Sequence, residues 1–186
     1  MNAWEVEELV IEVAEHLDGF TPLIRAGHPA YLIGPAGARL VVHPLWSQRG
    51  RIRVLGVYPD GSRSVLPNQK RHEITVTAAR GAASIAKRIE RRLLPGYRND
   101  LTTCRELLAA KAIQDGTRDQ LAETLAELLP DATLTANERA TVVLWRLGAT
   151  SGTFTVHSDA TTTIQIHAAD RELAERIADA VHHRAS

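Results

Sequence analysis

The sequence contains an internal repeat, which restricts the folds that the chain can adopt. An early stretch and a later stretch share apolar residues and an Ala-Glu pair at one constant offset. The matched positions are Leu9, Val13, Ala14, Glu15 and Leu17 against Leu121, Leu125, Ala126, Glu127 and Leu129. A second match follows in the same order in both copies. Its positions are Ile74, Val76, Ala78, Ala79, Ile85, Ala86, Arg88 and Ile89 against Ile164, Ile166, Ala168, Ala169, Leu173, Ala174, Arg176 and Ile177. We therefore interpret the chain as two diverged copies of one helix, strands, helix module.

The first copy, residues 1–98, is expected to be a basic α-ββββ-α module with about twenty more residues between the two matches than the second. Asn2 and Glu5 have the spacing of a capping box before an apolar-periodic run, and the helix is expected to end near Asp18 and Gly19. Strand signals follow, separated by turn residues, and a closing helix comes last. The strands are expected at 31–33, 39–46, 52–58 and 73–77, and the closing helix at about 81–94.

The second copy, residues 117–186, is expected to be an acidic α-βββ-α module. Thr117 and Gln120 give its capping-box spacing. Strand signals lie at 133–135, 141–147, 152–157 and 162–167, with a closing helix at about 170–183. Residues 99–116 carry a helical apolar stripe and predict a linker helix that breaks at Asp115 and Gly116.

Alternation along the second copy predicts which face of its sheet is apolar. Phe154, Val156, Ile164 and Ile166 point to one face, while threonines, Gln165 and histidines point to the other. The fold class that follows is α+β, with antiparallel sheets and the helices on one face of each. In the first copy, one core is expected from seven apolar residues. They are Leu9, Val13, Leu17, Ile74, Val76, Ile85 and Ile89.

Composition indicates where in the cell the protein is expected and whether it contacts a membrane. No apolar run approaches the roughly 20 residues of a membrane helix, and the first residues lack the basic start and apolar core of a signal peptide. The single cysteine, Cys104, excludes an intramolecular disulfide and a cysteine-based zinc cluster. We expect a cytoplasmic protein that does not contact membranes.

Charge is unevenly distributed along the chain although the net charge is zero. Residues 1–98 hold fourteen Arg and Lys against nine Asp and Glu, whereas residues 99–186 hold eight against thirteen. The basic residues concentrate on the first closing helix, at Arg80, Lys87, Arg88, Arg91 and Arg92. A second basic cluster comprises Arg49, Arg51, Arg53, Lys70 and Arg71. A basic surface of this kind favours a polyanionic partner.

Three explanations of the basic helix stay open at this stage. Its like charges four residues apart repel each other unless something anionic lies nearby. That anion is a nucleic-acid backbone, an acidic protein partner, or the acidic helix at the start of the same chain, which carries Glu5, Glu7, Glu8, Glu12 and Glu15. The residues expected to bind nucleic acid are Arg51, Arg53, Lys87, Arg88, Arg91 and Arg92.

The residue types that act in catalysis or bind metals in other proteins do not occur in this sequence at the spacings of such sites. None of the eight histidines has the close spacing of a metal site. His157 and His167 share the polar sheet face, but in a register that pairs Thr155 with Gln165 they lie at opposite ends of the hairpin. We expect no metal, no cofactor and no catalytic residue, hence a binding protein rather than an enzyme.

The stretch Ile74 to Val76, with Arg80, Gly81 and the run from Ile85 to Pro95, resembles uncharacterised proteins of actinobacteria and their phages. That resemblance implies no activity. In the order of elements, the second copy is similar to the double-stranded RNA-binding domain, and the paired modules are similar to the TATA-box-binding fold. The chain lacks the paired phenylalanines of the latter, because its only two are Phe20 and Phe154.

The function expected from the sequence is non-enzymatic binding of DNA or RNA through the basic surface of residues 1–98. The alternative is a protein-interaction or adaptor module, in which the oppositely charged halves associate with an acidic partner or with another copy of the chain.

Overall fold

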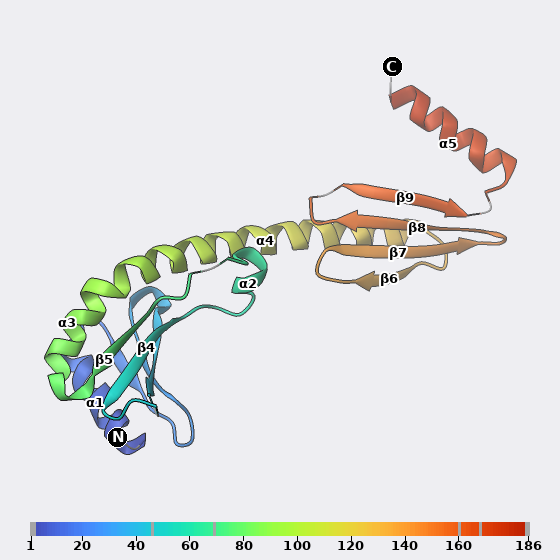
Figure 1. The fold of residues 1–186 in the computed structure, drawn as a ribbon. Helices are drawn as coiled ribbons and strands as arrows, with labels where there is room; N and C mark the ends of the chain where they lie inside the picture. Colours follow the sequence, from blue (N-terminus) through green and yellow to red (C-terminus); the bar gives the residue numbers. More distant parts are fainter. Residues whose placement is uncertain (1–2, 46, 69, 160, 168, 185–186) are drawn as a thin grey trace. The chain divides into compact units, whose positions relative to one another are not determined.

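The computed structural model describes residues 3–45, 47–68, 70–159, 161–167 and 169–184, and it confirms the α+β class with two antiparallel sheets (Figure 1). The chain divides into two compact units, Met1–Leu108 and Ala109–Ser186. Within the described residues, no helix combines the length and the apolar character that a membrane span requires.

The first unit contains a five-stranded antiparallel meander in which neighbouring strands follow each other along the chain. Its strands are β1 (Thr21–Leu23), β2 (Ala30–Ile33), β3 (Arg39–Pro44), β4 (Arg51–Val57) and β5 (Glu73–Thr77). The last four correspond to the four expected strands. The short strand β1 was not expected, because its three residues include Pro22 and lack the β-branched alternation that predicts a strand.

Two helices, α1 (Ala3–Glu15) and α3 (Ala82–Arg92), pack side by side on one face of this sheet. The expected core is confirmed: Val13, Leu17, Val76, Ile85 and Ile89 are buried together, and Leu9 and Ile74 pack against them. Short helical turns complete the unit, namely η1 (Pro35–Gly37), α2 (Ser62–Val65) and η2 (Ala78–Arg80). The capping residue expected at Asn2 lies outside the described residues.

Helix α4 (Leu94–Leu128) runs without interruption through the expected break at Asp115 and Gly116, so that prediction was wrong. One glycine costs a helix only about 1 kcal/mol relative to alanine. Asp115 also pairs within the helix with Lys111, at 2.9 Å, and with Arg118, at 3.1 Å. The expected capping box at Thr117 is wrong as well, because its hydroxyl donates to the carbonyl of Ile113 in mid-helix, at 3.0 Å.

The helical path is instead interrupted at Leu93, between α3 and α4. Pro95 follows two residues later. Its ring has no N–H to donate and crowds the preceding turn, so it is tolerated only near the start of a helix. Proline therefore places the boundary here, and it leaves α4 to continue from the first unit into the second.

The second unit contains a four-stranded antiparallel meander. Each of its strands coincides with one of the four strand signals, although the expected α-βββ-α module has only three strands. Its strands are β6 (Thr133–Ala136), β7 (Ala140–Leu147), β8 (Thr150–His157) and β9 (Thr162–His167), and α5 (Arg171–Arg184) follows. The expected register was wrong by two residues, because Thr155 pairs with Thr163 and Thr153 with Gln165. His157 and His167 still lie at opposite ends of the hairpin, and Nε2 of His157 is 3.1 Å from the hydroxyl of Thr163.

A small core and a polar contact hold α4 to this second sheet. Ala122, Val143 and Val156 are fully buried together. Near them Asp119 accepts hydrogen bonds from the Thr141 hydroxyl on β7, at 2.7 Å, and from Nε of Arg118, at 2.9 Å. These bonds hold the pKa of Asp119 below its usual value, the Arg118 bond contributing most.

Candidate nucleic-acid interface

Helix α3 separates its apolar and basic residues onto opposite sides. Ala82, Ile85, Ala86 and Ile89 are buried against the sheet and α1. Gly81 precedes the helix with φ 77° and ψ 155°, a conformation that is costly for residues with a Cβ. The reversal of the chain at Gly81 thus brings α3 back over the sheet and leaves its other side to solvent.

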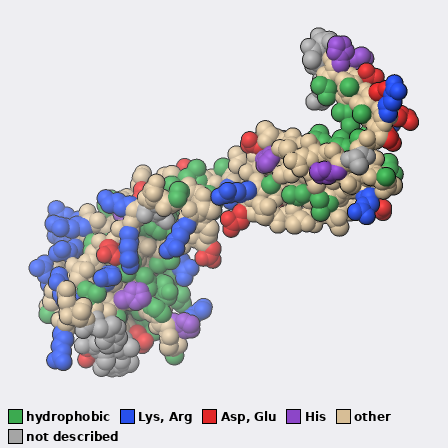
Figure 2. Space-filling view, turned by 45° about the vertical axis from the view of Figure 1, so that its right-hand side comes forward, with side chains coloured by type: hydrophobic (Ala, Val, Ile, Leu, Met, Phe, Trp, Pro, Cys, Tyr) green, Lys and Arg blue, Asp and Glu red, His purple; other side chains and the backbone are tan. Residues whose placement is uncertain are grey.

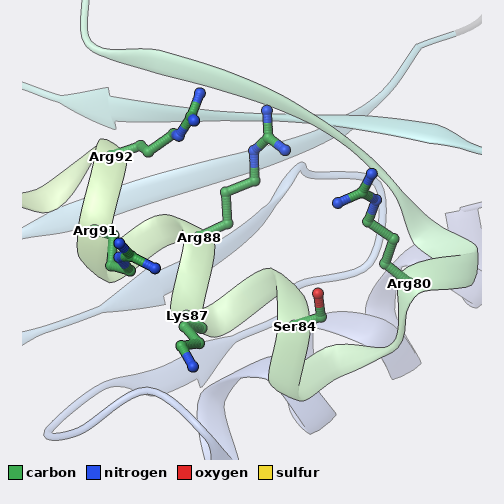
Figure 3. A pocket seen from close by; sticks show the side chains of 6 residues that line it. All are labelled: Arg80, Ser84, Lys87, Arg88, Arg91 and Arg92. Carbon is green, nitrogen blue, oxygen red and sulfur yellow. The ribbon is translucent and has the colours of Figure 1, made fainter.

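The solvent side of α3 forms an open groove of about 330 Å3. It is lined by Arg80, Ser84, Lys87, Arg88, Arg91 and Arg92, which we call the α3 groove. In Figure 3 the guanidinium groups of Arg80, Arg88 and Arg92 extend to the same side of the helix, while Lys87 points away from them. Figure 2 shows Lys and Arg side chains gathered over the first unit. Four of the six residues expected to bind nucleic acid lie in this groove.

The acidic helix α1 does not neutralise these charges through ion pairs. It packs beside α3, as expected. Nevertheless, among the described residues no carboxylate lies within 4.0 Å of a charged nitrogen of the five basic residues of the α3 groove. In addition, Nε of Arg88 is buried without a hydrogen-bond partner in the described part of the chain. Within the described residues, the groove therefore presents five cations without a carboxylate partner.

The two remaining expected site residues, Arg51 and Arg53, lie on the opposite face of the same sheet. Side chains alternate along β4, and Ile52 and Val54 are the ones buried under the helices. Arg51 and Arg53 consequently face away from α3. The six expected residues do not form one surface, because strand alternation places Arg51 and Arg53 on the face that the helices leave open.

Arg53 belongs to a separate basic area on that open face. Its cross-strand partner is His43, whose pKa is lowered mainly by burial and further by the charges of Arg53 and Arg71. Nearby, Arg63, Lys70 and Arg71 line a groove of about 400 Å3 together with apolar residues. Arg71 already pairs with Glu73, at 2.9 Å. This area is therefore partly compensated, unlike the α3 groove.

Sequence reasoning missed two polar features of this unit. Ser84 lines the α3 groove, and its position four residues after Arg80 and four before Arg88 was the available signal. His72 and Asp100 form a pair, with Nε2 and Oδ2 2.7 Å apart, that joins the approach to β5 with α4. The two residues lie far apart in the sequence, so no local spacing indicates this pair. The bond to His72 is the main reason that the pKa of Asp100 lies below its usual value.

The described residues contain no group of three His, Cys, Asp or Glu side chains arranged to hold a metal ion. Cys104 is a free, buried thiol whose pKa is raised by burial. No protein-family model, curated protein or solved structure matches this chain.

Proposed function

We propose that this protein binds nucleic acid through the α3 groove, without reading a specific sequence. The observation that supports the proposal most strongly is the set of five cations along α3 that lack a carboxylate partner within the described residues. An extended polyanion supplies the missing counter-charges at regular intervals.

The spacing of these cations has a cost in the free protein. Lys87 and Arg91, and likewise Arg88 and Arg92, are like charges four residues apart on one helix. Each such pair destabilises a helix by about 0.2–0.5 kcal/mol. A bound phosphate backbone reverses the sign of this effect, because each phosphate lies between cations that otherwise repel each other.

The chemistry of the side chains suits the phosphate groups of a nucleic-acid backbone. Four of the five cations are arginines, whose planar guanidinium donates two parallel hydrogen bonds to phosphate oxygens. The groove is open and has no aromatic side chain in its lining. Contacts to the backbone position a protein on nucleic acid without reporting base identity, so the affinity is expected to be similar for unrelated sequences.

The structure offers a matched pair of variants to test this proposal. Reversal of Arg91 and Arg92 to glutamate alters the α3 groove, whereas reversal of Arg49 and Arg51 makes the same charge change away from it. Fluorescence anisotropy of labelled duplex and single-stranded oligonucleotides at low salt would measure both. We expect the first variant to lose at least tenfold in affinity and the second to stay within about threefold of the parent.

Equal losses in the two variants would show that net charge, rather than the α3 groove, governs binding. No binding by the unmodified protein at high micromolar concentration would reject the proposal and favour the adaptor function. In that case sedimentation that depends on protein concentration and salt, and not on added nucleic acid, is the expected observation.

A further inference from the structure

The sheet of the second unit leaves an apolar strip uncovered at β9. Phe154 pairs with Ile164 across the strands, and Gly152 pairs with Ile166 on the same face. This is the face that packs on α4 through Val143 and Val156, yet Ile164 is 55 % exposed. Among the described residues, the core of this unit contains no side chain from β9 or α5. Two helices were expected to cover this face, but among the described residues α4 alone packs on it.

Helix α5 carries an apolar stripe that is equally uncovered. Leu173, Ala174, Ile177 and Val181 lie along one side of the helix. The acidic residues and the histidines lie on the other, namely Glu172, Glu175, Asp179, His182 and His183. Leu173 and Ile177 are only half-buried, and Val181 is 67 % exposed. A helix whose apolar and polar residues lie on opposite sides needs an apolar surface to pack on.

The repeat indicates which surface that is. The stripe matches Ile85, Ala86, Ile89 and Leu93 in the first copy, at the same spacing. Those four residues are at most 1 % exposed, because they pack on the sheet next to Ile74 and Val76. Ile74 and Val76 in turn match Ile164 and Ile166. By this correspondence, the stripe of α5 is complementary to the β9 strip.

The connection between β9 and α5 disfavours packing of the helix on its own sheet. In the first copy four residues, 78–81, join β5 to α3, and the last of them is Gly81 in its glycine-favouring conformation. In the second copy only residues 168–170 join β9 to α5, and none of them is glycine. A shorter connection without glycine is less suited to a reversal like the one at Gly81, and short connections of this kind favour exchange of an element between chains.

We propose that α5 of one chain packs on the β9 strip of a second copy, and that the exchange is reciprocal. Such an exchange gives a closed twofold dimer in which each sheet gains the helix it lacks. The contact is apolar, so it persists at high salt, where attraction between oppositely charged surfaces is screened. It does not depend on nucleic-acid binding.

Sedimentation equilibrium of the full chain at high salt tests this proposal. The expected result is a mass that doubles from the 20.4 kDa of the monomer as concentration rises. Ile177→Asp on α5 and Ile164→Asp on β9 should each restore the monomer. His183→Asp and Gln165→Asp introduce the same charge on the opposite sides of the same elements and should leave the dimer intact.

Circular dichroism of each variant checks that the fold is retained, as expected for changes outside both cores. A parent protein that stays monomeric at every concentration would overturn the proposal, including the case in which α5 folds back on its own sheet. A dimer that is lost with Ile177→Asp but kept with Ile164→Asp would also overturn it, since α5 would then pair with another α5.

Discussion

Tyr97 on α4 offers a sharp test of how the first unit is held together. Its ring is fully buried, and its hydroxyl lies 2.7 Å from the carbonyl oxygen of Val57 and 3.0 Å from the backbone nitrogen of Arg39. Gly56 leaves room for the ring, because a Cβ at that position would overlap with it. One hydroxyl thus joins the start of α4 to the paired strands β3 and β4.

Replacing Tyr97 with phenylalanine keeps the ring and removes only the hydroxyl. The N–H of Arg39 then loses its acceptor, and the carbonyl of Val57 loses a donor, at a site that water does not reach freely. A buried polar group without a partner costs about 1–3 kcal/mol, so we expect the free energy of unfolding to fall by that amount. Urea unfolding followed by near-ultraviolet dichroism reports mainly on this unit, because all three tyrosines and two of the three tryptophans of the chain belong to it.

Tyr31→Phe is the matched control, since the Tyr31 hydroxyl has no partner among the described residues, and the variant should lower the free energy of unfolding by no more than about 0.5 kcal/mol.

Burial raises the pKa of Tyr97. The folded state therefore keeps its proton longer than the unfolded state, and stability falls as the pH rises above the ordinary tyrosine pKa of about 10. Tyr97→Phe should remove part of this alkaline loss. Equal unfolding midpoints for the two variants would refute the role assigned to the Tyr97 hydroxyl.

Three further predictions concern stability. Ile89→Ala empties a site that is 0 % exposed and should cost about 2–5 kcal/mol; an unchanged thermal midpoint would contradict the proposed core. Gly116→Ala should stabilise the protein by about 0.5–1 kcal/mol, because Gly116 is exposed in mid-helix; destabilisation in urea would indicate that α4 breaks there. The lowered pKa of Asp100 contributes stability that is present above its ordinary value of 3.8 and is lost as the pH falls through the folded value. The free energy of unfolding of Asp100→Asn should therefore be lower than that of the parent near neutral pH and should fall less steeply as the pH is lowered.

Apolar periodicity was sufficient to predict the fold class and the first core. Strand and helix faces in residues 1–98 follow directly from alternating or helical spacing, and Val76 and Ile89 lie where those patterns place them. The helix boundaries depend on tertiary context instead. Asp115 and Gly116 look like a break in isolation, but ion pairs within α4 and contacts to the second sheet carry the helix through them.

The candidate site was predictable in part for the same reason. Lys87, Arg88, Arg91 and Arg92 lie on one helix, so their spacing alone brings them together. Arg51 and Arg53 also lie on one element, but only the burial of Ile52 and Val54 decides which face of the sheet they occupy. Whether the glutamates of α1 pair with α3 depends on side-chain geometry across two helices, which local sequence patterns do not specify.

The salt dependence of duplex binding is the decisive test of phosphate binding in the α3 groove. If all five cations of the α3 groove contact phosphates, the logarithm of the affinity should fall with the logarithm of salt concentration at a slope of up to about −4.5. Each neutralising substitution, such as Arg88→Gln or Arg92→Gln, should reduce the slope by about 1, equally for unrelated sequences. A slope that stays the same in these variants, or an affinity that does not respond to salt, would contradict the account.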